Sequence, residues 1–495
     1  MRVPVATVVG LALSATVAWG CTEAQDDPRL ATVVNTIVAA DMPFLRARPQ
    51  LAVGKYQRMA YWLYDFYRGT FPLYLHDARH GAMPVSSSAF WVPGALVTGM
   101  GDVHLENFGL VRGGDGVDAV EPNDFDAADR YPYLWEVRRL AAAMVVAARV
   151  SNPDDPDARQ LAAAASEDMA RAVATGYATR LDELAAGATP ERISDPGTSL
   201  HFADLFDRGQ GDWDDLEELE ELTELQDGAR RLRRGILEDD EPHKAFGELP
   251  AFVHEALPGL LSRYRGTLVN PPPPEYFALL DAVRRFGKGT ASWPRVRLIV
   301  LVQGPTDGVE DDVLLEVKEL MDSGAGGWAP PGVFYDSVPE RIIGTSRQLW
   351  AVPDAEPLWS ADQLRGFSVQ LRREAEGHKG LKWDRLEDEL GTPEALVDLA
   401  TRLGRLLARM HAASDETVVR AIAEVIATDP DGFAAEQAAA GVAYADQAVA
   451  DWQLFQRALD ELGPLLGVVP DLADAACPDL QALYGQPPVP APEPP

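Results

Sequence analysis

Two short segments of the chain concentrate side chains that suit work on a phosphate group. GDVHLENFG carries Asp102 and Asn107, and NDFDAAD, shortly after it, carries Asp124 and Asp126. A carboxylate can orient a hydroxyl group, and an amide oxygen with a further carboxylate suits a hard divalent ion that has few protein ligands, such as magnesium on a phosphate substrate. We therefore interpret Asp102 as a catalytic residue and Asn107 and Asp124 as metal ligands, with Asp126 as a candidate second carboxylate ligand.

Each of these residues also has a structural interpretation. Asp102 could cap its loop by accepting hydrogen bonds from backbone N–H groups, Asn107 could be a turn residue, and Asp126 could cap the following helix. We expect His104 to be a structural residue that bonds across its loop. Because the second acidic segment follows so closely, we favour the metal interpretation for the pair of segments.

The surrounding sequence predicts the elements that position these groups. The first segment is expected on a loop, and three glycines between the two segments indicate a hairpin there. WEVRRLAAAMVVAARV follows, is apolar on most faces and predicts a buried helix. Within that helix, Glu136 is expected to hold the loop through an internal ion pair with Arg138 or Arg139.

The periodicity changes further along the chain. Two β-branched and Leu-rich runs, separated by a turn rich in Gly, Pro and Asp, predict a hairpin from residue 295, and RGFSVQLRR predicts a third extended run. Helical spacing returns in LVDLATRLGRLLARMHAA. This order indicates an α+β protein with a mostly helical large lobe and a small antiparallel sheet lobe.

The charge balance excludes some partners. The chain carries 44 Lys and Arg against 77 Asp and Glu, a formal net charge of −33, which repels nucleic acid phosphates. We therefore expect no nucleic acid partner. Part of the charge lies in DWDDLEELEELTELQDG, where Leu216, Leu219, Leu222 and Leu225 recur every three residues and predict a solvated helix with one apolar stripe.

The first residues carry addressing information. MRVPVATVVGLALSATVAWG is a short apolar stretch that begins with one Arg and ends before Cys21, which predicts a secretory signal. The residues around Cys21 resemble the bacterial lipobox, which implies that Cys21 becomes a lipidated first residue and anchors the protein at the periplasmic face of a membrane. Thr22 lacks the Asp that often signals inner-membrane retention, so the outer membrane is favoured. A simple signal peptide, or an unprocessed hydrophobic N-terminus, is the alternative.

These features divide the chain into five parts. We predict a signal peptide with its lipobox at 1–21, a helical lobe with both acidic segments at 22–290, a small sheet lobe at 291–380, C-terminal helices at 381–483, and a disordered Pro-rich tail at 484–495. With two cysteines in the whole chain and one of them predicted to be lipidated, the fold must be stabilised by its core.

The motifs resemble known families. GDVHLEN resembles the catalytic loop of aminoglycoside phosphotransferases and other kinase-like small-molecule kinases. More closely, GDVHLENFG, NDFDAAD, LWEVRRLAAA, LEVKEL, FSVQLRR and RLLARMHAASD resemble, in that order, the bacterial family called domain of unknown function 2252, over roughly residues 50–415. The kinase resemblance implies that Asp102 is the catalytic Asp and that Asn107 and Asp124 bind metal, with Asp126 where that motif usually has Gly or Asp. It also implies Mg²⁺ and ATP, or another nucleotide, as cofactors.

The order of the motifs is unusual for such a resemblance. In kinase-like folds the sheet lobe with its Lys precedes the catalytic loop, whereas here VQGPTDGVEDDVLLEVKEL follows it by about two hundred residues. The resemblance therefore implies a protein-kinase-like two-lobe fold in a circularly permuted order. FSVQLRR then supplies the backbone hinge for an adenine, or else continues the sheet.

The permuted arrangement assigns the remaining site residues. Gly304 and Gly308 mark the turn that covers the phosphates, Lys318 contacts them, and Glu340 is the helix partner of Lys318, although two acidic residues lie beside Lys318 on its own strand. The same turn is rich in acidic residues. These are unfavourable beside a triphosphate unless a metal lies between them or the turn points outward.

Three functions are compatible with the sequence. The first is an exported kinase-like phosphotransferase that uses magnesium and a nucleotide to act on a hydroxyl of a small molecule or a protein. The second is a catalytically inactive, pseudokinase-like binding lipoprotein. The third is a metal-dependent phosphate hydrolase built on Asp102, His104, Asp124 and Asp126, in which a metal lowers the pKa of water. The first two require Lys318 for nucleotide binding, whereas the hydrolase does not.

Overall fold

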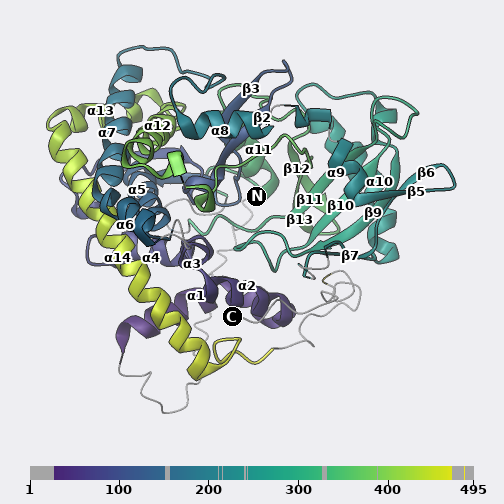
Figure 1. The fold of residues 1–495 in the computed structure, drawn as a ribbon, viewed down its shortest axis with the longest axis horizontal. Coiled ribbons are helices and arrows are strands. Elements are labelled where there is room, and N and C mark those ends of the chain that lie inside the picture. Colours follow the sequence, from purple (N-terminus) through teal and green to yellow (C-terminus); the bar gives the residue numbers. More distant parts are fainter. Residues whose placement is uncertain are drawn as a thin grey trace, which may run out of the picture.

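The structure is a computed structural model that describes residues 27–150, 156–209, 211–214, 216–238, 241, 243–325, 332–386, 388–470 and 484. These residues form an α+β fold, with helices on one side of the molecule and a seven-stranded antiparallel sheet on the other (Figure 1). The fold class and the small antiparallel sheet expected from the sequence are confirmed. The predicted signal peptide, Cys21 and all of the predicted tail except Tyr484 lie outside the described residues.

Four helices open the described chain: α1 (Pro28–Ala47), α2 (Pro49–Tyr61), α3 (Leu63–Gly69) and α4 (Phe71–His80). Asp27 caps α1 by accepting hydrogen bonds from the backbone N–H groups of Arg29 and Leu30. Within the described ranges, α1 is the one helix long and apolar enough to cross a membrane. Its inward face packs against α2 and the last long helix, as the core helix of a globular protein does.

The helical core is built from α5 (Tyr133–Val150), α7 (Ser166–Ala185), α12 (Pro393–Ala412) and α14 (Pro430–Leu462). As its Ala- and Val-rich sequence predicts, α5 is buried along nearly its whole length. Helices α7 and α12 approach closely because Gly176 and Gly404 lie at their crossing, where a Cβ on either would collide with the backbone of the other helix. The core is extended by α6 (Pro156–Ala164), α8 (Leu200–Gly209) and α13 (Glu416–Ala427).

The sheet has the strand order β12-β13-β11-β10-β9-β8-β7. Its strands are β7 (Gly235–Ile236), β8 (Ala245–Gly247), β9 (Leu279–Phe286), β10 (Arg297–Val302), β11 (Val313–Glu319), β12 (Ser360–Leu364) and β13 (Phe367–Arg373). One face is covered by α10 (Ala251–Thr267). Part of the other face is covered by α9 (Leu216–Leu222) and by the hairpin of β5 (Thr223–Gln226) and β6 (Ala229–Leu232). The chain passes from β11 to β12 through α11 (Val338–Leu349).

Two expectations differ from the structure in detail. The sheet begins at Gly235 and not at residue 291. The strand β9 was not predicted, because its charged sequence LLDAVRRF does not stand out as a β-branched run. The acidic segment is helical only as far as Leu222, and Leu225 lies exposed on β5. Asp227 and Gly228 adopt positive φ angles of 51° and 82° and reverse the chain there.

Two short antiparallel pairs frame the acidic segments. β1 (Leu96–Gly99) pairs with β4 (Asp129–Pro132), and β2 (Phe108–Arg112) pairs with β3 (Asp118–Pro122), which confirms the expected hairpin. GDVHLEN joins β1 to β2 and NDFDAAD joins β3 to β4. Because Gly99 lies opposite Asp129, and Phe108 opposite Pro122, both segments emerge at the same end of these pairs.

Candidate functional site

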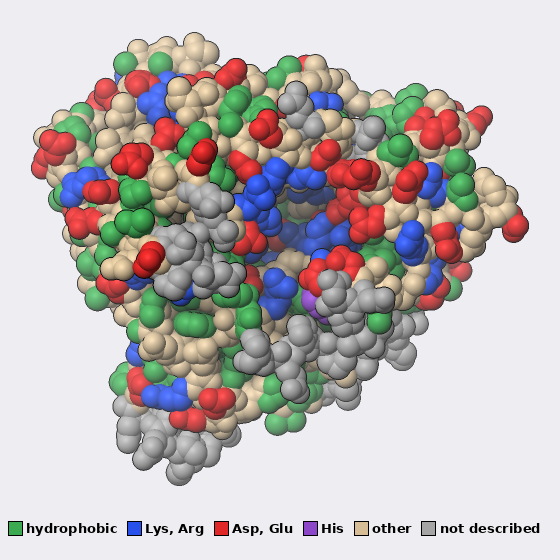
Figure 2. All heavy atoms as spheres, viewed as in Figure 1, with side chains coloured by type: hydrophobic (Ala, Val, Ile, Leu, Met, Phe, Trp, Pro, Cys, Tyr) green, Lys and Arg blue, Asp and Glu red, His purple; other side chains and the backbone are tan. Residues whose placement is uncertain are grey.

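A cavity of about 1080 Å³ lies between the sheet and the helices. Helices α1 to α4 and the two acidic segments form one wall, and the β9–β10 connection, β11 and β13 form the other. Nine Lys and Arg and eight Asp and Glu side chains line the cavity, although acidic residues greatly outnumber basic ones in the whole chain. Figure 2 shows Lys and Arg side chains gathered around the hollow. An anionic ligand therefore meets far less repulsion here than over the rest of the molecule.

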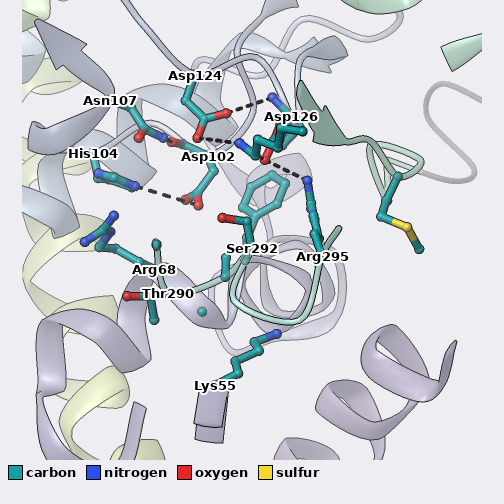
Figure 3. A pocket seen from close by; sticks show the side chains of 18 of the residues that line it. Lys55, Arg68, Asp102, His104, Asn107, Asp124, Asp126, Thr290, Ser292 and Arg295 are labelled. Atoms are coloured by element: carbon teal, nitrogen blue, oxygen red, sulfur yellow. Dashed lines mark hydrogen bonds and ion pairs between the residues drawn. The ribbon is translucent and has the colours of Figure 1, made fainter. Parts of the chain in front are cut away.

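Asp102 reaches the cavity from the loop between β1 and β2 (Figure 3). The fully buried Arg139 of α5 donates two hydrogen bonds to Oδ1 of Asp102, from Nε at 3.0 Å and from Nη2 at 2.6 Å. Oδ2 of Asp102 lies 3.9 Å from Nε2 of His104. Burial raises the pKa of Asp102, although the charge of Arg139 opposes this shift. One carboxylate oxygen is thus fixed by α5, whereas the second accepts no hydrogen bond from the described residues.

The loop between β1 and β2 is also held by Glu136, a second residue of α5. Oε1 of Glu136 accepts a hydrogen bond from the N–H of Gly101 at 2.7 Å, and Oε2 lies 2.6 Å from Nε2 of His411 on α12. Both side chains are fully buried. The expectation that Glu136 pairs with an Arg of its own helix is wrong, because Arg139 pairs with Asp102. Glu136 does hold the loop, but through the backbone.

His104 is buried, and its ring lies edge-on to Tyr64 with 6.1 Å between ring centroids. Burial lowers the pKa of His104 well below its usual value, and the nearby charges of Arg68 and Arg139 lower it further. A histidine with this pKa is neutral at physiological pH. Its burial agrees with a structural role, but the expected hydrogen bond across the loop is not seen. Nδ1 of His104 has no hydrogen-bond partner among the described residues, and Nε2 lies 3.9 Å from Asp102.

Asn107 and Asp124 present hard oxygen atoms to the cavity. Nδ2 of Asn107 donates to the backbone oxygen of Asp102 at 2.8 Å, which leaves its amide oxygen for a ligand. Oδ1 of Asp124 accepts from the N–H of Asp126 at 3.0 Å, and Oδ2 lies 3.6 Å from Nζ of Lys318. This pair of oxygens fits a magnesium ion that takes its other ligands from water and phosphate. The described part of the chain has no group of three or more His, Cys, Asp or Glu suited to hold a metal by itself.

Asp126 serves mainly as the anion of a buried ion pair. Its Oδ2 accepts from Nζ of Lys318 at 2.6 Å and from Nη1 of Arg295 at 2.7 Å. Burial alone would raise the pKa of Asp126, but these positive charges outweigh it and lower the pKa to about 2. Its Oδ1 is buried without a hydrogen-bond partner among the described residues. Asp126 therefore holds Lys318 and Arg295 with one oxygen, and its other oxygen has no hydrogen-bond partner among the described residues.

Lys318 lies on β11 and is 5% exposed. The expected helix partner, Glu340, does not reach it: Glu340 is exposed at the start of α11, where it accepts from the N–H of Asp336 at 3.0 Å. The pairing of Lys318 with Glu340 is therefore wrong, because NDFDAAD supplies the carboxylates instead. The buried cation of α11 is Arg341, which donates to the backbone oxygen of Asp126 at 3.1 Å.

The turn that contains Gly304 and Gly308 lies at the wrong end of the hairpin to cover a phosphate. Lys318 is opposite Arg297, whereas the turn follows Val302, five residues further along β10. Neither glycine lines the cavity. The prediction that this turn covers the phosphates is wrong. The alternative, that the acidic turn points away from them, agrees with its position outside the cavity.

The β9–β10 connection lines the cavity in its place. It has the sequence GKGTASWPR, and Lys288, Gly289, Thr290, Ser292 and Arg295 all line the cavity. Figure 3 shows Thr290, Ser292 and Arg295 among the lining side chains. This segment was missed from the sequence. The signal was present as a Gly-Lys-Gly-Thr run before a β-branched strand, but β9 was not recognised in front of it.

The helical wall carries further charges that the sequence did not single out. Nη1 of Arg68 pairs with Oε2 of Glu106 at 2.5 Å, and Nζ of Lys55 donates to both carboxylate oxygens of Asp41 at 2.6 and 2.8 Å. Arg68 lies in the last turn of α3. All four side chains line the cavity, and Figure 3 shows Lys55 and Arg68 among them.

A comparison with protein families agrees with the motifs. A family model described as "Uncharacterized protein conserved in bacteria (DUF2252)" matches residues 46–458. The chain belongs to this family. The match includes both acidic segments, the β9–β10 connection and Lys318, so every residue that lines the cavity, apart from those of α1, lies within the family region. No curated protein and no solved structure matches the chain.

Proposed function

We propose that the protein is a magnesium-dependent, kinase-like phosphotransferase that moves a phosphoryl group from a donor such as ATP to a hydroxyl of a small molecule or a protein. The observation that carries the proposal is the meeting of Lys318 with Asp124, beside Asn107 and Asp102, from segments about two hundred residues apart. Phosphoryl transfer requires these parts: a cation for the phosphates, oxygen ligands for a metal, and a carboxylate at the attacking hydroxyl.

The order of the sheet elements supports a permuted kinase-like fold. A Gly-containing connection joins β9 to β10, β11 carries the Lys, and α11 follows before β12 and β13. Protein kinases have a Gly-rich loop, a strand Lys and then a helix in this order, but with the catalytic loop after the sheet. Here the catalytic-loop segment comes first, as a circular permutation requires. α11 departs from the kinase pattern because it supplies Arg341 where a Glu is expected.

The residues divide the work as follows. Lys318, fixed by Asp126, binds and orients the phosphates of the donor. Asp102 orients the acceptor hydroxyl with Oδ2 and takes up its proton, for which its raised pKa is favourable. A magnesium ion held by Asn107 and Asp124 would neutralise the charge that develops on the transferred group. Export and lipidation at Cys21 remain part of this proposal.

The proposal is tested with the full chain, MgATP and the variant Asp102→Asn. A ligand at a hundred times its dissociation constant adds about 2.7 kcal/mol to the native state, so we expect the thermal midpoint to rise by a few degrees. Asn can still accept from Arg139, so the variant should show the same rise. Release of phosphate from MgATP should fall by a factor of about 10² to 10⁴ in the variant, because the base is lost.

Other outcomes select the other functions. An unchanged midpoint with MgATP and with other phosphoanhydrides would overturn the phosphotransferase proposal. Binding without any turnover in the natural protein would leave an inactive binding lipoprotein. Turnover that persists in Lys318→Ala would favour the metal-dependent hydrolase, which does not use that side chain.

A further inference from the structure

The two walls of the cavity carry opposite charge. On the sheet wall, residues 288–324 and 370–375 contribute six Lys and Arg side chains against three Asp and Glu, whereas the remaining wall contributes three against five. The acidic wall contains Asp102 and Asp124, where the proposed metal and acceptor lie. The basic wall contains Lys318, where the donor lies. The donor phosphates would therefore contact a surface with an excess of positive charge, which complements their negative charge.

The part of the sheet wall formed by β10, β11 and β13 carries charged side chains where a kinase would bind the nucleobase of ATP. Glu316, Lys318, Arg297 and Arg372 line the cavity from three adjacent strands, with Lys318 opposite Arg297 and Glu316 opposite Arg372. Glu316 is 4% exposed and pairs with Arg297, and its Oε2 lies 3.3 Å from Nζ of Lys288 in the β9–β10 connection. A purine laid on this floor would have to desolvate a buried ion network without replacing its hydrogen bonds.

The apolar part of the same sheet face is already covered. Ile299, Leu301 and Leu314 lie further along β10 and β11, where they pack against three Leu side chains of α9 and β6. Of the described side chains on the sheet wall, only Ala291, Met321 and Ala375 are apolar, and none is aromatic. The sheet wall thus offers no broad apolar surface on which an adenine could stack.

The histidine that follows β13 does not supply the missing surface. The ring of His378 lies edge-on to Trp213, with 5.3 Å between ring centroids, and its Nδ1 lies 3.3 Å from Nη2 of Arg372. The backbone next to it is closed as well, because a Cβ on Gly377 would collide with the ring of Trp213. The connection after β13 is therefore packed by the protein itself. FSVQLRR, for which an adenine hinge or a continuation of the sheet was expected, forms β13 and continues the sheet.

We propose that the cleft recognises its donor through the phosphate chain alone and accepts linear inorganic polyphosphate with magnesium. This inference rests on the proposed phosphotransferase function and names the donor of that same site. The acceptor hydroxyl oxygen attacks the terminal phosphorus and forms the new P–O bond. The P–O bond to the bridging oxygen breaks, and its electron pair stays on the shortened polyphosphate. The hydroxyl proton passes to Asp102.

The test measures binding of Mg-tripolyphosphate, MgATP and adenosine to the full chain by calorimetry. We expect tripolyphosphate and ATP to bind with dissociation constants within about threefold of each other, and adenosine to give no heat. A purine stacked on the protein would make ATP about tenfold or more tighter than tripolyphosphate. Lys318→Ala should lose both phosphate ligands, whereas Arg420→Ala, at an exposed ion pair far along the chain, should keep them.

The outcomes separate the two proposals. If MgATP binds and tripolyphosphate does not, or if adenosine binds by itself, the base is recognised and the inference fails while the phosphotransferase proposal stands. If neither phosphate ligand binds, both proposals fail. If tripolyphosphate binds equally well to Lys318→Ala, it binds outside the cleft and the inference fails.

Discussion

The two ends of the β10–β11 hairpin look alike in sequence but differ in what surrounds them. Each end has a turn or connection with a glycine at positive φ, +83° for Gly289 and +77° for Gly304. The pairing of Arg297 with Lys318 and of Val302 with Val313 places the ends five residues apart, or about 17 Å. Only the end with Gly289 lines the cavity. A glycine-rich turn therefore identifies a phosphate loop only once the strand register is known.

The charges at the two ends differ in the same way. At the cavity end, Lys318 contacts Asp126 at 2.6 Å, and the pKa of Asp126 falls to about 2. At the turn end, Nε of Arg230 is 3.9 Å from Oδ2 of Asp312, and burial raises the pKa of Asp312 to about 6 although Arg230 opposes it. The cavity end thus holds a true ion pair, whereas the turn end holds a carboxyl group that burial drives toward its neutral form.

The largest expected effect comes from breaking the ion pair at the cavity end. Lys318→Ala leaves the buried Asp126 with Arg295 alone, and loss of one partner of a buried pair costs about 3–5 kcal/mol of unfolding free energy. In a double-mutant cycle with Asp126→Ala, measured by urea unfolding at pH 7, we expect a coupling of about 2–3 kcal/mol.

The matched control is the cycle of Arg230→Ala with Asp312→Ala at the turn end. Because this contact is long and Asp312 takes up a proton readily, the coupling should stay below about 1 kcal/mol. Equal couplings in the two cycles would contradict the contrast between the ends. A thermal midpoint for each variant, taken alongside, shows whether it still folds cooperatively.

The next effect separates binding from stability with two alanine substitutions. In Gly304→Ala the Cβ collides with the backbone oxygen of Asp311, so we expect a loss of about 1–3 kcal/mol in stability and no change in the affinity for Mg-tripolyphosphate. In Gly289→Ala the Cβ meets Oγ of Ser292 at 2.5 Å, which can rotate away, so the stability loss should be about 1 kcal/mol. Affinity should fall about tenfold, because Gly289 lines the cavity.

This pair of variants can fail in a definite way. If Gly304→Ala weakens ligand binding as much as Gly289→Ala does, the acidic turn covers the phosphates after all. Calorimetric titration at a temperature well below both thermal midpoints keeps loss of fold apart from loss of affinity.

Local sequence predicts the elements that depend on short-range pattern. The buried α5, the β2–β3 hairpin, the β10–β11 hairpin and the helix α12 all follow from apolar spacing and turn residues. The grouping of Asp102, Asn107 and Asp124 also follows from sequence, because a hairpin returns the second segment to the first. In these cases the deciding contacts join residues close together in the chain.

Contacts between distant segments decide the rest. Lys318 pairs with Asp126 and not with Glu340 because the cavity wall, not the neighbouring helix, faces its strand. β9 escapes recognition because Arg284 and Arg285 interrupt its apolar pattern, while a partner elsewhere makes the charge acceptable: Nη1 of Arg285 pairs with Oε1 of Glu374 at 2.8 Å. The sequence does not show such partners, because folding brings them together. Since β9 was not predicted, the segment that contains Lys288 could not be recognised as the connection between two strands.

The smallest expected effect is a pH dependence confined to the turn end. The folded-state pKa of Asp312, about 6, lies above the unfolded value of about 3.9, so the folded protein binds more protons between these values. The stability that protonated Asp312 contributes is present below about pH 4 and is lost as the pH rises through about 6. Asp312→Asn should therefore flatten part of the decline in unfolding free energy between pH 4 and 7, measured by urea unfolding at each pH.

The cavity end supplies the contrast for this measurement. Asp126 has a depressed pKa of about 2, so its contribution is complete above about pH 4 and disappears only as the pH falls through 2. Asp126→Asn should lower the stability and leave the slope between pH 4 and 7 unchanged. Glu356, whose pKa burial raises to about 7 against the charge of Arg372, titrates in the same window and should preserve part of the decline in both variants. A slope that responds to Asp126→Asn and not to Asp312→Asn would reverse the assignment of the ion pair and the neutral carboxyl to the two ends of the hairpin.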